Sequence, residues 1–205
     1  MARVGLLGGS FNPPHVGHML CAQEALAALE LDRVLLVPVH TPPHKEMEGD
    51  PGAAARVELC RLAVADAPGL EVSTLETDRP GRSYTVDTLR ALHDADPGNE
   101  LTFIAGADQA CGLPDWREPA ALLELAELAV AEREATRRED VLERLSVLPG
   151  AAGRVRFFAM PRVDVSSSLV RGRVAAGRPI RWLVPDAVAR AIADGGLYRT
   201  PVGTR

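Results

Sequence analysis

Short apolar runs alternate along the chain with segments whose apolar residues recur at the spacing of a helix. The apolar runs, together with one alternating stretch, predict strands at residues 3–7, 33–39, 70–75, 101–106, 128–131 and 154–160. Helical spacing predicts helices over residues 16–29, 56–67, 119–125, 132–144, 166–176 and 186–193. A further helix follows the cap-type residues 83–87 and ends near residue 93. The charged helix over 132–144 is expected to face solvent.

This alternation predicts the fold class. We expect an α/β fold with a Rossmann-like, doubly wound and mostly parallel sheet, and with helices on both faces. One domain should span residues 1–205, with a small helical part at residues 161–205. In such sheets, ligands bind beyond the carboxyl ends of the strands. Four segments fall there and are expected to share one crevice: residues 8–18, 39–45 and 106–108, and the start of the helix at Ser166.

Length, net charge, apolar runs and cysteine spacing limit the classes of protein to which this chain can belong. The chain has 205 residues, 46% of them hydrophobic, which is enough for one sizeable core. Its formal net charge of −5 argues against nucleic acid held by a basic surface, whereas small anions remain plausible ligands. With no apolar run near the roughly 18 residues of a membrane span and no signal-peptide pattern, we expect a cytoplasmic protein without a membrane partner. Cys21, Cys60 and Cys111 are too widely spaced to predict a disulfide framework or a thiolate zinc site.

The most distinctive segment runs from Gly8 to His18. Gly8 and Gly9 allow backbone to approach a nucleotide closely, and the helix start beyond them directs free amide groups at an anion. His15 and His18, three residues apart, could donate hydrogen bonds to phosphate oxygens. Such a pair is as often an ordinary cap, and a zinc pair is disfavoured because no carboxylate lies at ligand spacing. Neither GxxxxGK[ST] nor GxGxxG occurs, so any phosphate site is of another kind.

A second group of polar residues opens the helix expected from Ser166. Ser166, Ser167 and Ser168 offer hydroxyls and free amide groups, and Arg171 follows one turn further in. Together these groups can bind an anion. Taken alone, the serines are more typical of plain N-capping than of an anion site.

The two segments together resemble a known superfamily. GGSFNPPHVGH at residues 8–18 resembles the first signature of the nucleotidyltransferases that carry an HxGH motif, and VSSSLVR at 165–171 resembles their second. Further segments are similar to the bacterial nicotinate-nucleotide adenylyltransferases of that superfamily: TPPHK at 41–45, SYTVDTL at 83–89, FIAGAD at 103–108, PDW at 114–116 and GGLYR at 195–199. The resemblance covers nearly the whole chain. It implies in-line transfer of the adenylyl group of ATP to nicotinate mononucleotide in NAD biosynthesis, without a covalent intermediate, yielding deamido-NAD and pyrophosphate.

The resemblance also implies roles for individual residues. The catalytic residues would be His15, His18, Lys45 and Arg171. ATP would be bound by Gly8, Gly9, Ser10, Phe11, His15, His18, Lys45, Gly106, Asp108, Arg133, Ser166, Ser167, Ser168 and Arg171. Nicotinate mononucleotide would be bound by Asn12, Lys45, Tyr84, Thr85, Asp108 and Trp116, with its ring stacked on the tryptophan. Mg²⁺ is expected to arrive with ATP, held mainly by the phosphates, and no metal site made of protein ligands is expected.

Several alternatives stay open at this point. Trp116 can instead be a loop anchor, and Asp108 a helix cap. Arg133 is followed by Glu-Ala-Thr where relatives commonly carry a turn of the Arg-Pro-Gly type, so the shape of that loop and any contact from it to adenosine stay open. The acceptor can be nicotinamide mononucleotide or another phosphate ester, and a nucleotide-binding regulator without turnover is the rival from another class. The oligomeric state is also open, a homo-oligomer included.

Overall fold

A six-stranded parallel sheet forms the centre of the computed structural model, which describes residues 1–43, 46–132 and 137–199. The strands are β1 (Arg3–Gly9), β2 (Arg33–Pro38), β3 (Leu70–Val72), β4 (Glu100–Gly106), β5 (Ala126–Glu132) and β6 (Val155–Ala159). Their order is β3-β2-β1-β4-β5-β6, and every pairing is parallel. The predicted α/β fold is therefore confirmed, with its switch point between β1 and β4.

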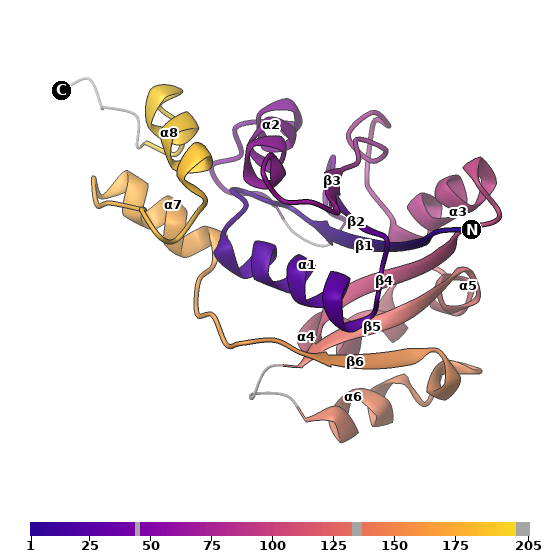
Figure 1. Ribbon diagram of the computed structural model, residues 1–205. Helices are drawn as coiled ribbons and strands as arrows, with labels where there is room; N and C mark the ends of the chain where they lie inside the picture. The colour runs from indigo at the N-terminus through magenta and orange to yellow at the C-terminus, as the bar shows by residue number, and fades with distance from the viewer. Residues whose placement is uncertain (44–45, 133–136, 200–205) are drawn as a thin grey trace.

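Helices cover both faces of the sheet (Figure 1). The helices are α1 (Val16–Ala28), α2 (Ala53–Val64), α3 (Thr85–Ala95), α4 (Ala107–Gly112), α5 (Pro119–Leu125), α6 (Arg138–Leu145), α7 (Ser167–Ala175) and α8 (Asp186–Asp194). Because neighbouring residues of a strand point to opposite faces, Leu6 packs with α3 to α6 and Leu7 packs with α1 and α2. This two-sided burial explains why the strands are continuous apolar runs.

The two C-terminal helices pack beside the sheet instead of on it. α7 and α8 rest against α2 through an apolar cluster made of Leu59, Val170, Ile180, Val184, Val188 and Ile192. The Val16 N–H, at the start of α1, donates to the Leu183 carbonyl at 3.0 Å. This packing brings the start of α7 to the side of the molecule where β1 ends (Figure 1).

Three predicted elements differ from the observed ones. The third strand ends at Val72, not at residue 75, because the chain turns back there and the Asp78 N–H donates to the Thr74 carbonyl. α2 begins at residue 53, ahead of the predicted 56, after the left-handed Gly52. The helix predicted over 132–144 begins later than expected, whereas its charged residues Arg138, Glu139, Asp140, Glu143 and Arg144 are exposed, as predicted.

Glu132 still belongs to β5, and α6 begins only at Arg138. Val141 and Leu145 on α6 are buried against the sheet, so the helix is amphipathic and not wholly solvent-facing. Residues 133–136 lie outside the described residues. Within the described ranges, no helix combines the length and apolarity that crossing a membrane requires.

Candidate active site

Two cavities adjoin at the carboxyl ends of β1 and β2. The first, here called the aromatic cavity, has a volume of about 280 Å³ and is lined by Gly8, Gly9, Ser10, Val39, Pro42, Pro43, Glu76, Ser83, Tyr84, Thr85, Val86, Phe103, Gln109, Trp116 and Arg117. The second, here called the polar cavity, has a volume of about 470 Å³ and is lined by Ser10, Asn12, His18, Glu46, Met47, Glu48, Ser166, Ser167, Ser168 and Arg171. Ser10 lines both cavities. Three of the four segments expected to share one crevice thus contribute to a pair of cavities that meet at the turn after β1, whereas residues 106–108 line neither cavity.

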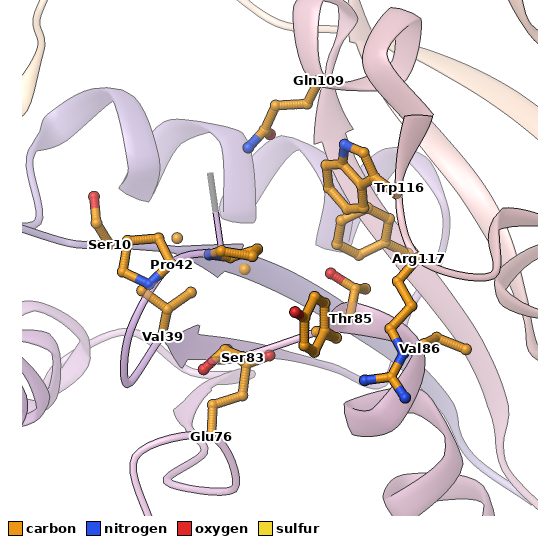
Figure 2. Close-up of a pocket in the computed structure, with 15 residues that line it drawn as sticks. Ser10, Val39, Pro42, Glu76, Ser83, Thr85, Val86, Gln109, Trp116 and Arg117 are labelled. Atoms are coloured by element: carbon orange, nitrogen blue, oxygen red, sulfur yellow. The ribbon is translucent and has the colours of Figure 1, made fainter. Parts of the chain in front are cut away.

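Trp116 forms one wall of the aromatic cavity. It follows a short 3-10 helix, Leu113–Asp115, and its ring meets the Phe103 ring edge-on with centroids 5.7 Å apart. Figure 2 shows Trp116 on one side of the cavity, across from Ser10 and Val39. The wall is therefore a flat aromatic surface supported by the core.

Tyr84 and Thr85, at the start of α3, join Trp116 around this cavity. The Arg117 guanidinium lies 4.7 Å from the centre of the Tyr84 ring, a cation–π contact. Three of the residues expected to bind the mononucleotide are thus brought together. Arg117 was not among the predicted site residues, because an arginine beside a tryptophan in a loop carries no distinguishing sequence signal.

Glu76 is a buried carboxylate in the wall of the aromatic cavity. It is 5% exposed, and its Oε1 accepts a hydrogen bond from Thr88 Oγ1 at 2.7 Å. Oε2 has no hydrogen-bond partner among the described residues. Burial raises the pKa of this carboxyl, and hydrogen bonds from Thr88 and Ser83 and the charge of Arg79 oppose the rise. Sequence analysis missed Glu76, since nothing separates it from the acidic residues of an ordinary turn.

His15 and His18 stand at the start of α1. The His15 backbone N–H donates to His18 Nδ1 at 3.2 Å, which assigns the proton of a neutral His18 ring to Nε2. The ring centroids are 3.7 Å apart, and a Cβ added at Gly17 would lie 3.1 Å from the His15 ring. His18 lines the polar cavity, whereas His15 is 7% exposed and is the N-cap residue. The pair therefore shares one face as predicted, and the capping alternative is also correct for His15.

Hydrogen bonds join the second motif, residues 165–171, to the first motif, residues 8–18. Ser167 Oγ donates to the Pro13 carbonyl at 2.8 Å, and Arg171 Nη1 donates to the Asn12 carbonyl at 2.8 Å, across 154 and 159 positions of sequence. Arg171 Nη2 also donates to Ser168 Oγ at 3.2 Å. These contacts make one polar site from two distant segments.

Ser166 is the N-cap residue of α7, and its side chain accepts a hydrogen bond from the Leu169 N–H at 3.1 Å. The N-capping alternative is thus correct for Ser166. All three serines nevertheless line the polar cavity together with Arg171.

The remaining predicted residues are distributed unevenly. Gly8 and Gly9 line the aromatic cavity, but Phe11 is fully buried, with its ring 4.9 Å from that of His18. Asn12 lines the polar cavity and not the aromatic one, and its Nδ2 donates to the Glu48 carbonyl at 3.1 Å.

The end of β4 contributes a different residue from those predicted. Gly106 precedes α4 and Asp108 is exposed in its first turn, yet neither is among the residues that line the two cavities. Gln109, the next residue, lines the aromatic cavity. Lys45 and Arg133 lie outside the described residues. Within the described ranges, no cluster of three or more His, Cys, Asp or Glu side chains could hold a metal ion.

Comparisons with known proteins show which proteins this chain is similar to. A model of the cytidylyltransferase-like family matches residues 6–173. The probable nicotinate-nucleotide adenylyltransferase of Roseiflexus sp. (strain RS-1) is 44% identical over 198 residues, which cover 97% of this chain and 98% of that protein. The probable nicotinate-nucleotide adenylyltransferase of Shouchella clausii (strain KSM-K16) is 40% identical over 202 residues, 97% of each chain.

Among solved structures, Plasmodium falciparum nicotinic acid mononucleotide adenylyltransferase complexed with NaAD matches with a TM-score of 0.79 at 17% identity. The match covers 97% of this chain and 98% of that one. At this identity the likeness supports the fold alone. With a family model that spans most of its length and relatives at 40% identity or above over nearly the whole chain, this protein belongs to the nicotinate-nucleotide adenylyltransferase family of cytidylyltransferase-like proteins.

Proposed function

We propose that this protein transfers the adenylyl group of ATP to nicotinate mononucleotide, giving deamido-NAD and pyrophosphate. The observation that carries the proposal is the meeting of an aromatic and a polar cavity at Ser10. A flat pyridine ring suits the first cavity and a triphosphate suits the second. Two substrates bound in this way would bring the acceptor phosphate close to the α-phosphate of ATP.

The polar cavity supplies donors for the triphosphate. Arg171 and Ser168 lie in the first turns of α7, where the free amide groups and the helix dipole also favour an anion. His18 contributes its Nε2 proton, with the His15 ring stacked against it. We assign Lys45 to the same phosphates by its place in the family motif.

The chemistry needs donors more than bases. An oxygen of the acceptor phosphate is already an anion, so it can form its bond to the α-phosphorus while the bond to the β-phosphate oxygen breaks and pyrophosphate leaves. Catalysis then depends on in-line positioning and on donors that stabilise the charge on the transferred and leaving groups. His18 is our candidate for the donor to the α-phosphate.

In the aromatic cavity, the ring would stack on Trp116. Its carboxylate would meet the backbone amides that open α3, including that of Thr85.

We expect Mg²⁺ to enter as a partner of ATP, held mainly by the phosphates. The ion would neutralise part of the phosphate charge. The three cysteines are free thiols, which supports a reducing compartment such as the cytoplasm.

Pyrophosphate release from ATP, measured over a panel of acceptors, tests the proposal. We expect release with nicotinate mononucleotide, and a lower kcat/KM with nicotinamide mononucleotide assayed beside it. Equal or better use of the amide would change the assigned acceptor. Binding of ATP with no release on any acceptor would favour a nucleotide-binding regulator.

A further inference from the structure

One buried cation lies behind the point where the two cavities meet. Arg56, on α2, has a side chain with no exposed surface. Its Nη1 donates to the Ser10 carbonyl at 3.0 Å and to the Val39 carbonyl at 2.7 Å, its Nη2 donates to the His40 carbonyl at 3.1 Å, and its Nε donates to Asp50 Oδ1 at 2.9 Å. Four of the five N–H donors of the guanidinium are thus used.

These acceptors belong to the two loops that form the cavity walls. Ser10 follows β1 and lines both cavities, and Val39 follows β2 and lines the aromatic one. The next residue, His40, is held from the opposite side as well, because its N–H donates to Ser83 Oγ at 2.9 Å. Arg56 therefore connects the β1 loop to the β2 loop and fixes the distance between them.

The contact also sets the direction of a peptide group. In a trans peptide the C=O and the following N–H point to opposite sides, so a Ser10 carbonyl turned to Arg56 directs the Phe11 N–H away from α2. Phe11 has a φ of 44°, in the left-handed region that a non-glycine residue seldom adopts. A fixed, charge-assisted partner for the preceding carbonyl helps to hold this conformation.

The fourth bond extends the connection to the polar cavity. Asp50 follows Glu48 and Gly49. The Glu48 carbonyl accepts from Asn12 Nδ2, and a Cβ added at Gly49 would lie 3.8 Å from Arg171 Cδ. The segment that Arg56 holds through Asp50 thus packs beside the arginine of the second motif.

We propose that Arg56 is a positioning residue that aligns the two substrates without touching either. The inference rests on the proposed adenylyl transfer. Fixing Ser10 and Val39 together determines where the acceptor phosphate lies relative to the α-phosphate. Lysine cannot replace arginine here, because a single ammonium group cannot reach three carbonyls and a carboxylate that surround a planar fork.

The test compares Arg56→Lys with Asp50→Asn and with Arg61→Lys. Arg61 is the matched control, because it lies on the same helix with its side chain 58% exposed. We expect Arg56→Lys to lower kcat by about 10–100-fold, the scale on which small misplacements of reacting groups act. The Kd for ATP alone and for the mononucleotide alone should stay within about threefold of wild type, at one site per chain, because the contacts inside each cavity remain. Asp50→Asn should lower kcat by a smaller factor, and Arg61→Lys should leave it unchanged.

The proposal would be overturned if the number of binding sites per chain fell by the same factor as kcat. Arg56 would then be a purely structural residue. So would an unchanged kcat in folded Arg56→Lys. If Arg56→Lys does not fold, Asp50→Asn decides, because unchanged kcat there contradicts the connection through Asp50. Failure of the proposed function is recognised separately, as wild-type protein that releases no pyrophosphate.

Discussion

Replacing Trp116 with alanine should weaken the binding of nicotinate mononucleotide by about 1–3 kcal/mol, the range for removing one aromatic side chain that stacks on a base. At about 1.4 kcal/mol for each factor of ten, this is a rise in Kd of roughly fivefold to somewhat above a hundredfold. Trp116 lines the aromatic cavity and is not among the residues that line the polar one. The Kd for ATP should therefore stay within about twofold, since an uninvolved side chain changes binding by only tenths of a kcal/mol.

The second tryptophan supplies the control. The chain has two tryptophans, and Trp182 is 73% exposed, with the Arg181 guanidinium 4.6 Å from its ring centre. Trp182→Phe leaves Trp116 as the sole tryptophan, so fluorescence titrations of this variant report on the aromatic cavity. Binding of the mononucleotide to Trp116→Ala is then measured by calorimetry, with thermal unfolding recorded in parallel.

Two results would refute this reasoning. Equal weakening of both ligands, together with a lower Tm, would make Trp116 a loop anchor that supports the core through Phe103. Tryptophan fluorescence of Trp182→Phe that does not respond to saturating mononucleotide would place the ring elsewhere.

Three further predictions concern the other parts of the site. His18→Ala should lower kcat by about a hundredfold or more, the scale of a lost transition-state donor, and unchanged turnover in folded protein would contradict its role. Ser167→Ala should lower the Tm by about 2–4 °C, because it removes a hydrogen bond to Pro13 worth about 1 kcal/mol, and a differential scanning measurement checks this. Glu76 has a folded pKa above its unfolded value of about 4.3, so its contribution to stability is full below that pH and is lost as pH rises through the folded pKa. Glu76→Gln should therefore become more stable relative to wild type as the pH rises from about 4.3 through the folded pKa in urea unfolding, and a pH-independent difference would refute the assignment.

Local pattern was sufficient to predict the sheet. The runs around Leu6, Leu35 and Ile104 are buried from both sides, so they carry the continuous apolar signal of parallel strands. The first motif could also be recognised, because glycines, two prolines and two histidines lie close together within residues 8–18. These features depend on neighbouring residues, and a single sequence contains that information.

Arg56 and Glu76 could not be found in the same way. Arg56 takes its carbonyl partners from residues 16, 17 and 46 positions away, and along the sequence it is only a basic residue in a helical segment. Arg56 can be recognised as part of the site only from its complete burial and its bond to the turn after β1, and both depend on where α2 packs. At the end of β4, Gln109 lines the aromatic cavity, whereas Asp108 is exposed in the first turn of α4 and its predicted contact with a ribose stays a prediction.

The polar cavity depends on apolar packing at a distance from it. Arg171 can reach the Asn12 carbonyl only while α7 keeps its place, and α7 packs through Val170, which is fully buried among residues of α2 and α8. Two neighbouring side chains of α7 thus have different functions. Val170 packs into the apolar cluster, and Arg171 binds the first motif. α2 also carries Arg56. This helix therefore contacts α7 through Leu59 in the apolar cluster and binds the two cavity loops through Arg56. α2 therefore contributes to the relative position of the phosphate donors and the acceptor wall, in addition to the direct bonds between the two motifs.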